Sequence, residues 1–325
     1  TVADEKGQAT YLQAFSQSQL NLGTSLKLNL GIHTAYLGLN QEFVVEPRLG
    51  LTYALSNTRS LGLAYSQHSR MEPLGLYFAQ VDGQRPNTEL ALAKAHHFVL
   101  SYDVSLSEYL RLKVEPYLQL ITDVPVIADS TYSTLNMEAE WFFNQALVND
   151  GSGYNYGLDI TLERFLNKGY YFLLTASLFD SRYTGGDGVG RNTRYNTRYV
   201  VNALAGKEWQ LGQGGRRVLG VNGRLNFLGG QRMTPFDEAA SIAAQDMVYL
   251  SDQTFEDSKP DVYHLNLTLS YRINKPGHSS IWAIQVINAL GTEEFYGYSY
   301  NFRTKAIDED KNTVVVPSIS YKIEF

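Results

Sequence analysis

Charged side chains of both signs recur at alternate positions in several segments of this 325-residue sequence. Guanidinium, ammonium and carboxylate groups that share one face of a strand can bind a polar ligand through charge-assisted hydrogen bonds, or can pair with one another. We expect most of these groups to pair. As the best candidates for ligand contact we take Glu46, Arg48, Arg111, Lys113, Glu115, Asp159, Glu163, Arg224 and Arg272.

The sequence carries no motif that would support catalysis. The G-x-S-x-G and H-E-x-x-H patterns are missing, and Gly185–Gly190 lacks the Lys and Ser/Thr of a phosphate-binding loop. His33, His68 and His278 have no partner at a recognisable spacing, and there is no Cys. We therefore predict that the protein is not an enzyme and needs no cofactor.

Two other clusters could bind a metal ion, and we predict that neither does. His96 and His97 are adjacent, so on a strand their side chains point to opposite faces. Asp308, Glu309 and Asp310 form a short acidic run, which fits a solvated loop better than a Ca²⁺ site or a cation site that bridges lipopolysaccharide. The net charge of −6 also argues against a nucleic-acid partner.

Strict alternation of apolar and polar residues dominates the sequence. In Tyr263–Ile273 the odd-numbered residues are apolar or aromatic, and the even-numbered ones are polar. Arg217–Phe227 shows the same pattern, with Gly223 on its apolar face. This period predicts β-strands with one apolar and one polar face, and therefore an all-β fold.

The alternating segments are too long for an ordinary soluble β-sandwich, which would share the period. They run for about 11–13 residues, whereas globular strands average about 5–6 and a tilted membrane strand needs about 9–11. Tyrosines lie near the strand ends, as in the aromatic girdles of membrane barrels; we place there Tyr53, Tyr65, Tyr170, Tyr171, Tyr263, Tyr271 and Tyr321. The pattern favours an antiparallel transmembrane β-barrel.

The connections between strands alternate between short and long, except the link near residues 36–42. Outer-membrane barrels have short periplasmic turns and long extracellular loops. We predict about 13 long strands, approximately 9–19, 25–36, 43–55, 60–70, 93–104, 109–121, 154–165, 170–182, 199–209, 217–228, 262–273, 280–290 and 315–325. The segment 295–300 would make 14, but we interpret it as an extension of the preceding strand beyond the bilayer.

The number of strands and the first residues both predict that residues 1–325 are part of a longer protein or a processed one. Bacterial single-chain barrels have an even number of strands, and the loop pattern makes the first strand descend toward the periplasm, so at least one strand is expected upstream. The first residues show no signal peptide, so we expect a mature, trimmed or excised chain.

The last strand ends in an aromatic residue. Tyr321, Ile323 and Phe325 alternate with Lys322 and Glu324. A terminal strand of this form resembles the assembly signal of bacterial outer-membrane barrels.

Several segments resemble the barrel of TonB-dependent transporters of the Bacteroidota type. The resemblance covers nearly all 325 residues, and rests on Glu46–Leu51, Ser60–Ser69, Thr161–Phe172, Leu267–Ile273 and Val286–Ala289. It implies a 22-stranded outer-membrane barrel whose lumen is plugged. Residues 1–325 would be the C-terminal part of that barrel, without the plug, the TonB-binding segment and the first strands.

The resemblance also implies a function and a set of partners. The function would be TonB-dependent uptake of a scarce nutrient such as a siderophore, cobalamin, a glycan or a peptide. The partners would be outer-membrane lipid and lipopolysaccharide, the TonB complex, the barrel assembly machinery and a surface lipoprotein. A plug-free porin is the alternative. Loop aromatics could cap a substrate chamber, namely Trp141, Phe142, Phe143, Phe236, Tyr249, Phe255, Tyr296 and Tyr298.

Overall fold

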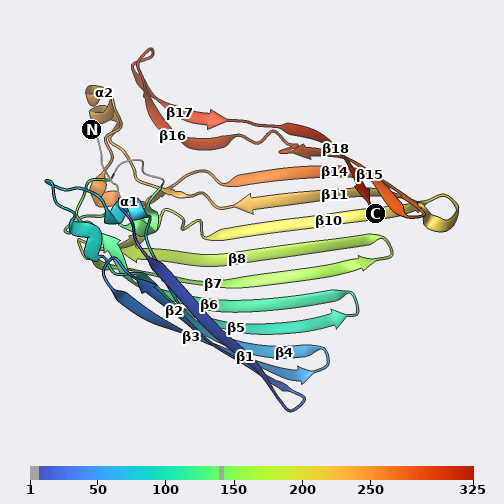
Figure 1. The fold of residues 1–325 in the computed structure, drawn as a ribbon. Coiled ribbons are helices and arrows are strands. Elements are labelled where there is room, and N and C mark those ends of the chain that lie inside the picture. Colours follow the sequence, from blue (N-terminus) through green and yellow to red (C-terminus); the bar gives the residue numbers. More distant parts are fainter. Residues whose placement is uncertain (1–6, 139–142) are drawn as a thin grey trace.

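The computed structural model describes residues 7–138 and 143–325, and most of them lie in one antiparallel sheet. Thirteen long strands follow one another in this sheet almost in chain order (Figure 1). They are β1 (Tyr11–Leu22), β2 (Leu26–Leu37), β3 (Glu42–Ser56), β4 (Arg59–Arg70), β5 (Ala93–Ser107), β6 (Leu110–Val126), β7 (Val148–Asn167), β8 (Tyr170–Thr184), β10 (Tyr199–Leu211), β11 (Arg217–Leu228), β14 (Val262–Lys275), β15 (His278–Ile287) and β18 (Val316–Glu324).

The remaining elements are short and lie in the long connections. β9 (Gly190–Asn192) pairs with β8 and is the fourteenth strand of the sheet. Two separate pairs are β12 (Arg232–Met233) with β13 (Asp257–Ser258), and β16 (Glu294–Asn301) with β17 (Ala306–Asn312). The helices are α1 (Leu74–Tyr77), α2 (Glu238–Ala244) and the 3₁₀ turns η1 (Pro86–Glu89), η2 (Thr134–Asn136), η3 (Gln213–Gly215) and η4 (Ser251–Gln253). Within the described residues, no helix is long and apolar enough to cross a membrane.

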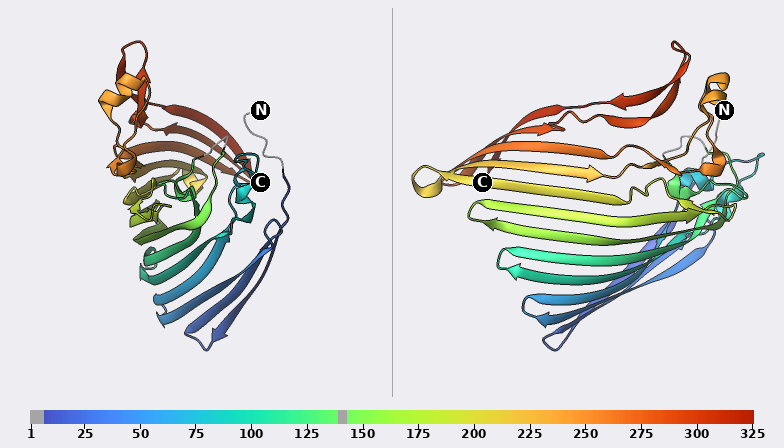
Figure 2. Two further views of the ribbon diagram at one scale, coloured as in Figure 1. Left: turned by 90° about the vertical axis from the view of Figure 1, so that its left-hand side faces the viewer. Right: turned by 180° about the vertical axis from the view of Figure 1, so that it is seen from behind.

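The sheet is curved into an open trough. Seen end-on it forms an arc that is open on one side (Figure 2). Its two outermost strands are β1 and β18, and in the described residues neither pairs with a second strand on its outer edge. Every residue of β18 is exposed as a result.

All long connections lie at one end of the trough, which we call the long-loop end. The short β2–β3 turn lies at this end too. The opposite end, the short-turn end, carries tight turns and the C-terminus (Figure 1). The turn between β7 and β8 shows how tight these are. Lys168 and Gly169 both have positive φ, of 52° and 79°, which is the requirement of a two-residue type I′ hairpin turn.

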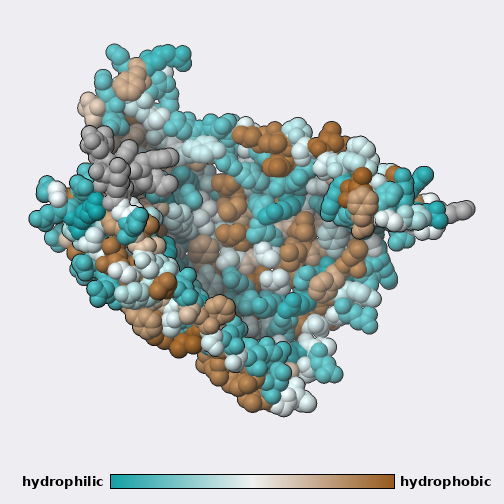
Figure 3. Space-filling model, viewed as in Figure 1, coloured by the Kyte–Doolittle hydropathy of each residue, from teal (hydrophilic) through white to brown (hydrophobic). Residues whose placement is uncertain are grey.

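Alternation along the strands separates the two faces of the wall. On β14 the odd-numbered Leu267 and Leu269 are 43% and 46% exposed, while Thr268 between them is half-buried. The more exposed side chains lie on the convex face, because curvature spreads them apart. Figure 3 looks into the concave side, where hydrophilic residues line much of the hollow. The predicted all-β antiparallel fold and its 13 long strands are confirmed.

Two finer predictions were wrong. The segment 295–300 does not extend β15, because the chain turns at Asn288, whose φ is 51°, and then forms the separate β16–β17 hairpin. Tyr171 is not part of an outer girdle. Tyr171 pairs with Gly206, and its ring lies where a Cβ of that glycine would be. Asn202 and Thr175 lie on the same face of the sheet. This face is the concave one, so Tyr171 points into the trough.

A small hydrophobic core closes part of the long-loop end. The connection 71–92, which contains α1 and η1, folds into the trough and buries apolar residues at the ends of β2 and β3. This core contains Ala35, Leu37, Val44, Leu76, Tyr77, Ala79, Leu90, Leu92, Phe143 and Leu147. Loops at this end are therefore packed structures with fixed surfaces.

Candidate functional site

Five of the nine candidate ligand-binding residues lie together on β6 and β7. Arg111 donates to both carboxylate oxygens of Asp103 on β5, at 2.9 and 3.2 Å from its Nε. Lys113 Nζ lies 2.7 Å from Glu115 Oε1. In the strand register, Arg111 is opposite Glu163 and Glu115 is opposite Asp159. This ladder of alternating charge lies on the concave face, and two of its members, Lys113 and Glu115, pair with each other.

Glu46 and Arg48 form a second group on β3. Glu46 is only 2% exposed. Its carboxylate lies 2.8 Å from Nδ1 of His33, 3.6 Å from Arg48, and accepts from the backbone and side chain of Ser69, with 2.8 Å to the amide N. Glu46 therefore joins three neighbouring strands, β2, β3 and β4, and its oxygens are occupied by protein donors.

Arg224 and Arg272 lie apart from both groups, on β11 and β14. Among the described residues, neither forms an ion pair with a carboxylate. The two adjacent histidines face opposite sides, as predicted. His97 contacts Gln119 at 2.9 Å, and His96 contacts the Tyr65 hydroxyl at 3.0 Å.

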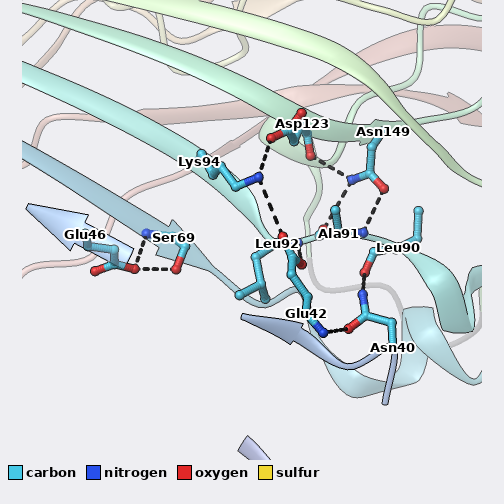
Figure 4. Close-up of polar contacts among 10 residues, drawn as sticks. All are labelled: Asn40, Glu42, Glu46, Ser69, Leu90, Ala91, Leu92, Lys94, Asp123 and Asn149. Carbon is cyan, nitrogen blue, oxygen red and sulfur yellow. Dashed lines mark hydrogen bonds and ion pairs between the residues drawn. The ribbon is translucent and has the colours of Figure 1, made fainter. Parts of the chain in front are cut away.

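Polar side chains clamp the connection 71–92 onto the wall, as Figure 4 shows. Glu42 accepts the Leu92 amide at 2.7 Å, and Lys94 bridges Glu42 and Asp123 at 3.5 and 2.9 Å. Asn149 accepts the Ala91 amide at 2.8 Å. Because β3, β5, β6 and β7 all contribute to this clamp, the position of the connection is fixed from several strands.

Asn87 joins two connections to each other. Its side chain is fully buried, donates to Leu76 O and Gln145 O at 3.0 Å each, and accepts the Leu147 amide at 2.8 Å. The connection 71–92 is thereby attached to the connection 127–147.

Replacing Asn87 with alanine is expected to release these connections from each other. The variant loses three hydrogen bonds of a buried side chain and removes this partner from the Gln145 carbonyl and the Leu147 amide, which should cost about 2–4 kcal/mol of local stability. Hydrogen exchange of amides in residues 71–92 should accelerate accordingly. Asn144→Ala, at an exposed position in the same region, is the control. Equal exchange rates in the two variants would contradict the role of Asn87.

The packing of this connection should also depend on alkaline pH. Tyr77 is fully buried, and burial raises the pKa of its hydroxyl from 10.0 to about 12. The folded state therefore favours the neutral phenol. The stabilisation is complete below pH 10 and is lost as the pH rises from 10 toward 12, by about 3 kcal/mol in all.

Tyr77→Phe removes this titration. Limited proteolysis near the Gly83 turn should increase between pH 10 and 12 in the wild-type protein, and should increase less in the variant because phenylalanine has no proton to lose. If wild type and variant opened at the same pH, Tyr77 would not be the controlling group.

A cleft of about 470 Å³ lies among the other connections, and we call it the loop cleft. It combines cationic and aromatic side chains from connections that are far apart in sequence. They are Arg194, Arg232 and Lys259, with Tyr249, Phe255, Tyr296 and Tyr298; among the described residues that line the cleft, Glu138 is the one carboxylate.

Sequence reasoning anticipated the rings of the loop cleft but missed its cations. Phe255, Tyr249, Tyr296 and Tyr298 line it, and Phe236 packs on Tyr298 with ring centroids 4.8 Å apart. Phe143 is instead part of the hydrophobic core, and Trp141 and Phe142 lie outside the described residues. The acidic run lies on the β16–β17 hairpin, where Asp308 and Asp310 accept from Asn301 and Ser299. No group of three or more metal-ligating side chains occurs in residues 7–138 or 143–325.

Comparison with known families identifies this architecture. The family model described as TonB dependent receptor-like, beta-barrel, matches residues 2–289. The chain belongs to this family. A TonB-dependent receptor barrel lies in the outer membrane, with its long loops outside the cell and its short turns in the periplasm. The loop cleft is therefore extracellular, and the convex face of the wall contacts lipid.

Solved structures of the same fold agree. The outer-membrane transporter YddB from Escherichia coli has a TM-score of 0.68 at 8% identity, over 97% of this chain and 45% of that one. The ferric yersiniabactin uptake receptor FyuA from Yersinia pestis has a TM-score of 0.65 at 13% identity, over 98% and 46%. The ferric preacinetobactin receptor BauA from Acinetobacter baumannii has a TM-score of 0.64 at 13% identity, over 96% of this chain and 43% of that one.

This TonB-dependent receptor barrel spans less than half the length of each of those structures. At these identities the likeness is one of fold alone. A search of curated protein sequences found no significant match.

Proposed function

We propose that this chain is the C-terminal part of the barrel of a TonB-dependent transporter that takes up a scarce nutrient. The observation that carries the proposal is the family match over residues 2–289 on a curved wall of thirteen long strands with packed loops at one end. The charge ladder around Arg111 lies on the concave face, where it would contact a plug or a ligand, whereas the buried Glu46 on the same face joins β2, β3 and β4. The chain performs no chemistry on its substrate.

The free edges of β1 and β18 support the view that further strands complete the cylinder. Unpaired backbone groups at a strand edge cost several kcal/mol each in hydrocarbon, so membrane barrels are closed. A 22-stranded transporter would add roughly nine strands to the thirteen here, together with a plug in the lumen. We propose that this plug and a TonB-binding segment belong to the same protein.

The open wall does not favour a plug-free porin. A porin made from this chain would need β1 and β18 to pair with each other, and within the described residues they do not. Conductance measurements on the reconstituted full-length protein separate the two functions, because a plugged transporter forms no stable open pore.

Two of the similar structures support one nutrient class. FyuA is described as a ferric yersiniabactin uptake receptor and BauA as the ferric preacinetobactin receptor, and we propose an iron chelate ahead of cobalamin, a glycan or a peptide. We also propose that the protein is of the Bacteroidota type, that the barrel assembly machinery inserts it beside lipopolysaccharide, and that a surface lipoprotein could dock on its loops.

Uptake assays test the transport function. Cells that express the full-length protein should accumulate the nutrient with TonB present and should lose uptake when TonB is deleted or the proton gradient is collapsed. Undiminished uptake without TonB would overturn the proposal.

A further inference from the structure

The loop cleft contains a buried cation, Arg232, that forms no ion pair with a carboxylate among the described residues. Arg232 on β12 is only 6% exposed. Its Nε donates to Asn196 O at 3.2 Å, and its Nη1 donates to Glu256 O at 3.1 Å. Both acceptors are backbone carbonyls, and among the described residues no carboxylate lies within ion-pair distance. The carbonyls hold the guanidinium in place but leave its positive charge available to the cleft.

Charged groups of both signs surround Arg232. Burial lowers the pKa of Arg232, the guanidinium groups of Arg198 and Arg182 lower it further, and the carboxylates of Asp180 and Asp257 raise it. An arginine side chain nevertheless stays protonated in proteins. Burial of a charged group costs free energy unless an opposite charge approaches it, and a bound anion would supply that charge.

Two further cations line the same cleft. Lys259 Nζ donates to the backbone carbonyl of Tyr296 at 2.7 Å. Arg194 pairs with Glu138, whose side chain is 71% exposed, and its guanidinium carbon lies 5.6 Å from the centre of the Phe255 ring. The sequence as a whole has a net charge of −6, so three cations against one carboxylate among the described lining residues are a local reversal of sign.

Aromatic rings accompany the cations. Tyr249 is 54% exposed and Tyr296 is 56% exposed, so their rings are accessible to a ligand. Phe255 is held edge-on by Tyr183, with centroids 6.2 Å apart. Rings of this kind pack against flat unsaturated groups, and guanidinium and ammonium groups bind anionic oxygens. Neutral sugars would need hydrogen-bonding amides and carboxylates in place of the cations.

We propose that the loop cleft is a binding subsite for an anionic chelate with flat aromatic groups, in which Arg194, Arg232 and Lys259 bind anionic oxygens and Tyr249 and Phe255 contact the rings. The inference rests on the proposed transport function and specifies its substrate class. The loop cleft would be the first place on the extracellular side where such a ligand is held.

Binding to the purified full-length protein in detergent tests this proposal. The probe is a ferric tris-catecholate, which is anionic and aromatic, and the reference is a cationic ferric trihydroxamate of similar size. Both are titrated while intrinsic tyrosine and tryptophan fluorescence is followed. The tris-catecholate should bind at least about tenfold more tightly, since one charge-assisted hydrogen bond contributes about 1.5–3 kcal/mol. Its affinity should fall with added salt.

Single variants locate the subsite. Lys259→Gln and Arg194→Gln should each weaken tris-catecholate binding about tenfold and leave trihydroxamate binding unchanged. Arg232→Gln should weaken it at least as much, and Arg232→Lys should recover part of the loss. Because Arg232 also supports the loops, the two other variants keep the test valid if R232Q does not fold. Lys311→Gln, on the exposed β17 strand outside the cleft, is the matched control.

Equal binding of the two chelates, or unchanged tris-catecholate affinity in both Lys259→Gln and Arg194→Gln, would overturn the subsite. If TonB-dependent uptake of another nutrient persisted in that case, the transport function would stand without it. Loss of TonB dependence for every nutrient would instead remove the proposed function.

Discussion

Leu267→Arg is expected to destabilise the membrane-embedded barrel by about 2–4 kcal/mol, the cost of an arginine on the lipid face near the bilayer midplane. Leu267 lies in the middle of β14, is 43% exposed on the convex face, and pairs with Gly223 of β11 and Val286 of β15. A guanidinium there would have to enter hydrocarbon or distort the bilayer to reach water.

Thr268→Arg is the matched control for this prediction. It places the same side chain one residue further along β14, on the concave face beside Asn222 and Gln285. That side of the wall faces an aqueous lumen or a plug, so the cost should stay within about 1 kcal/mol. Unfolding by urea of the full-length protein in phospholipid vesicles measures both variants. A similar cost for the two would contradict the assignment of faces.

Deleting Phe325 is expected to remove most of the assembled barrel from the outer membrane. The proposed assembly signal is Tyr321 and Ile323 on β18 and Phe325 directly after it, and these residues are 49%, 43% and 100% exposed. Tyr321 is anchored on Trp282 of β15, with ring centroids 4.4 Å apart. The terminal ring thus lies at the short-turn end, directly after a strand whose outer edge pairs with no other strand among the described residues.

Lys322→Ala on the opposite face of β18 controls for general damage to this strand. It should leave assembly nearly unchanged, because the one ion pair of Lys322 within the described part of the chain is with the neighbouring Glu324, at 2.6 Å. The amount of heat-modifiable barrel in outer-membrane fractions reports both variants. Normal assembly without Phe325 would rule out the terminal residue as the signal.

The long strands of the sheet could be predicted from the sequence because one physical rule determines their residue pattern. Each strand must present apolar residues to lipid on one face, so period-2 alternation locates the strands wherever it holds. The rule fails where strands leave the hydrocarbon. β7 begins at Val148, earlier than the predicted 154, and there Gly151 and Gly153 look like a loop in sequence. Both glycines nevertheless belong to β7, because they pair with residues of β6.

The candidate site could be predicted only in part. Alternation assigns Arg111 and Glu163 to one face, but their partners depend on strand register, which a single sequence does not provide. The ion pair between Arg111 and Asp103, for example, joins two strands across a turn. The cations of the loop cleft could not be predicted from the sequence. Arg194, Arg232 and Lys259 lie on connections without any periodic pattern, and folding alone brings them together.

The central claim is that lipid, and not a second sheet, covers the apolar face of this wall. The described sequence contains no Cys, so single cysteines along β14 can carry spin labels without background in this region. In vesicles, labels at 263, 265, 267, 269 and 271 should be accessible to oxygen dissolved in lipid. Labels at 264, 266, 268 and 270 should be accessible to a water-soluble nickel reagent or shielded by a plug. An oxygen accessibility without this two-residue period, or with the opposite phase, would contradict the account.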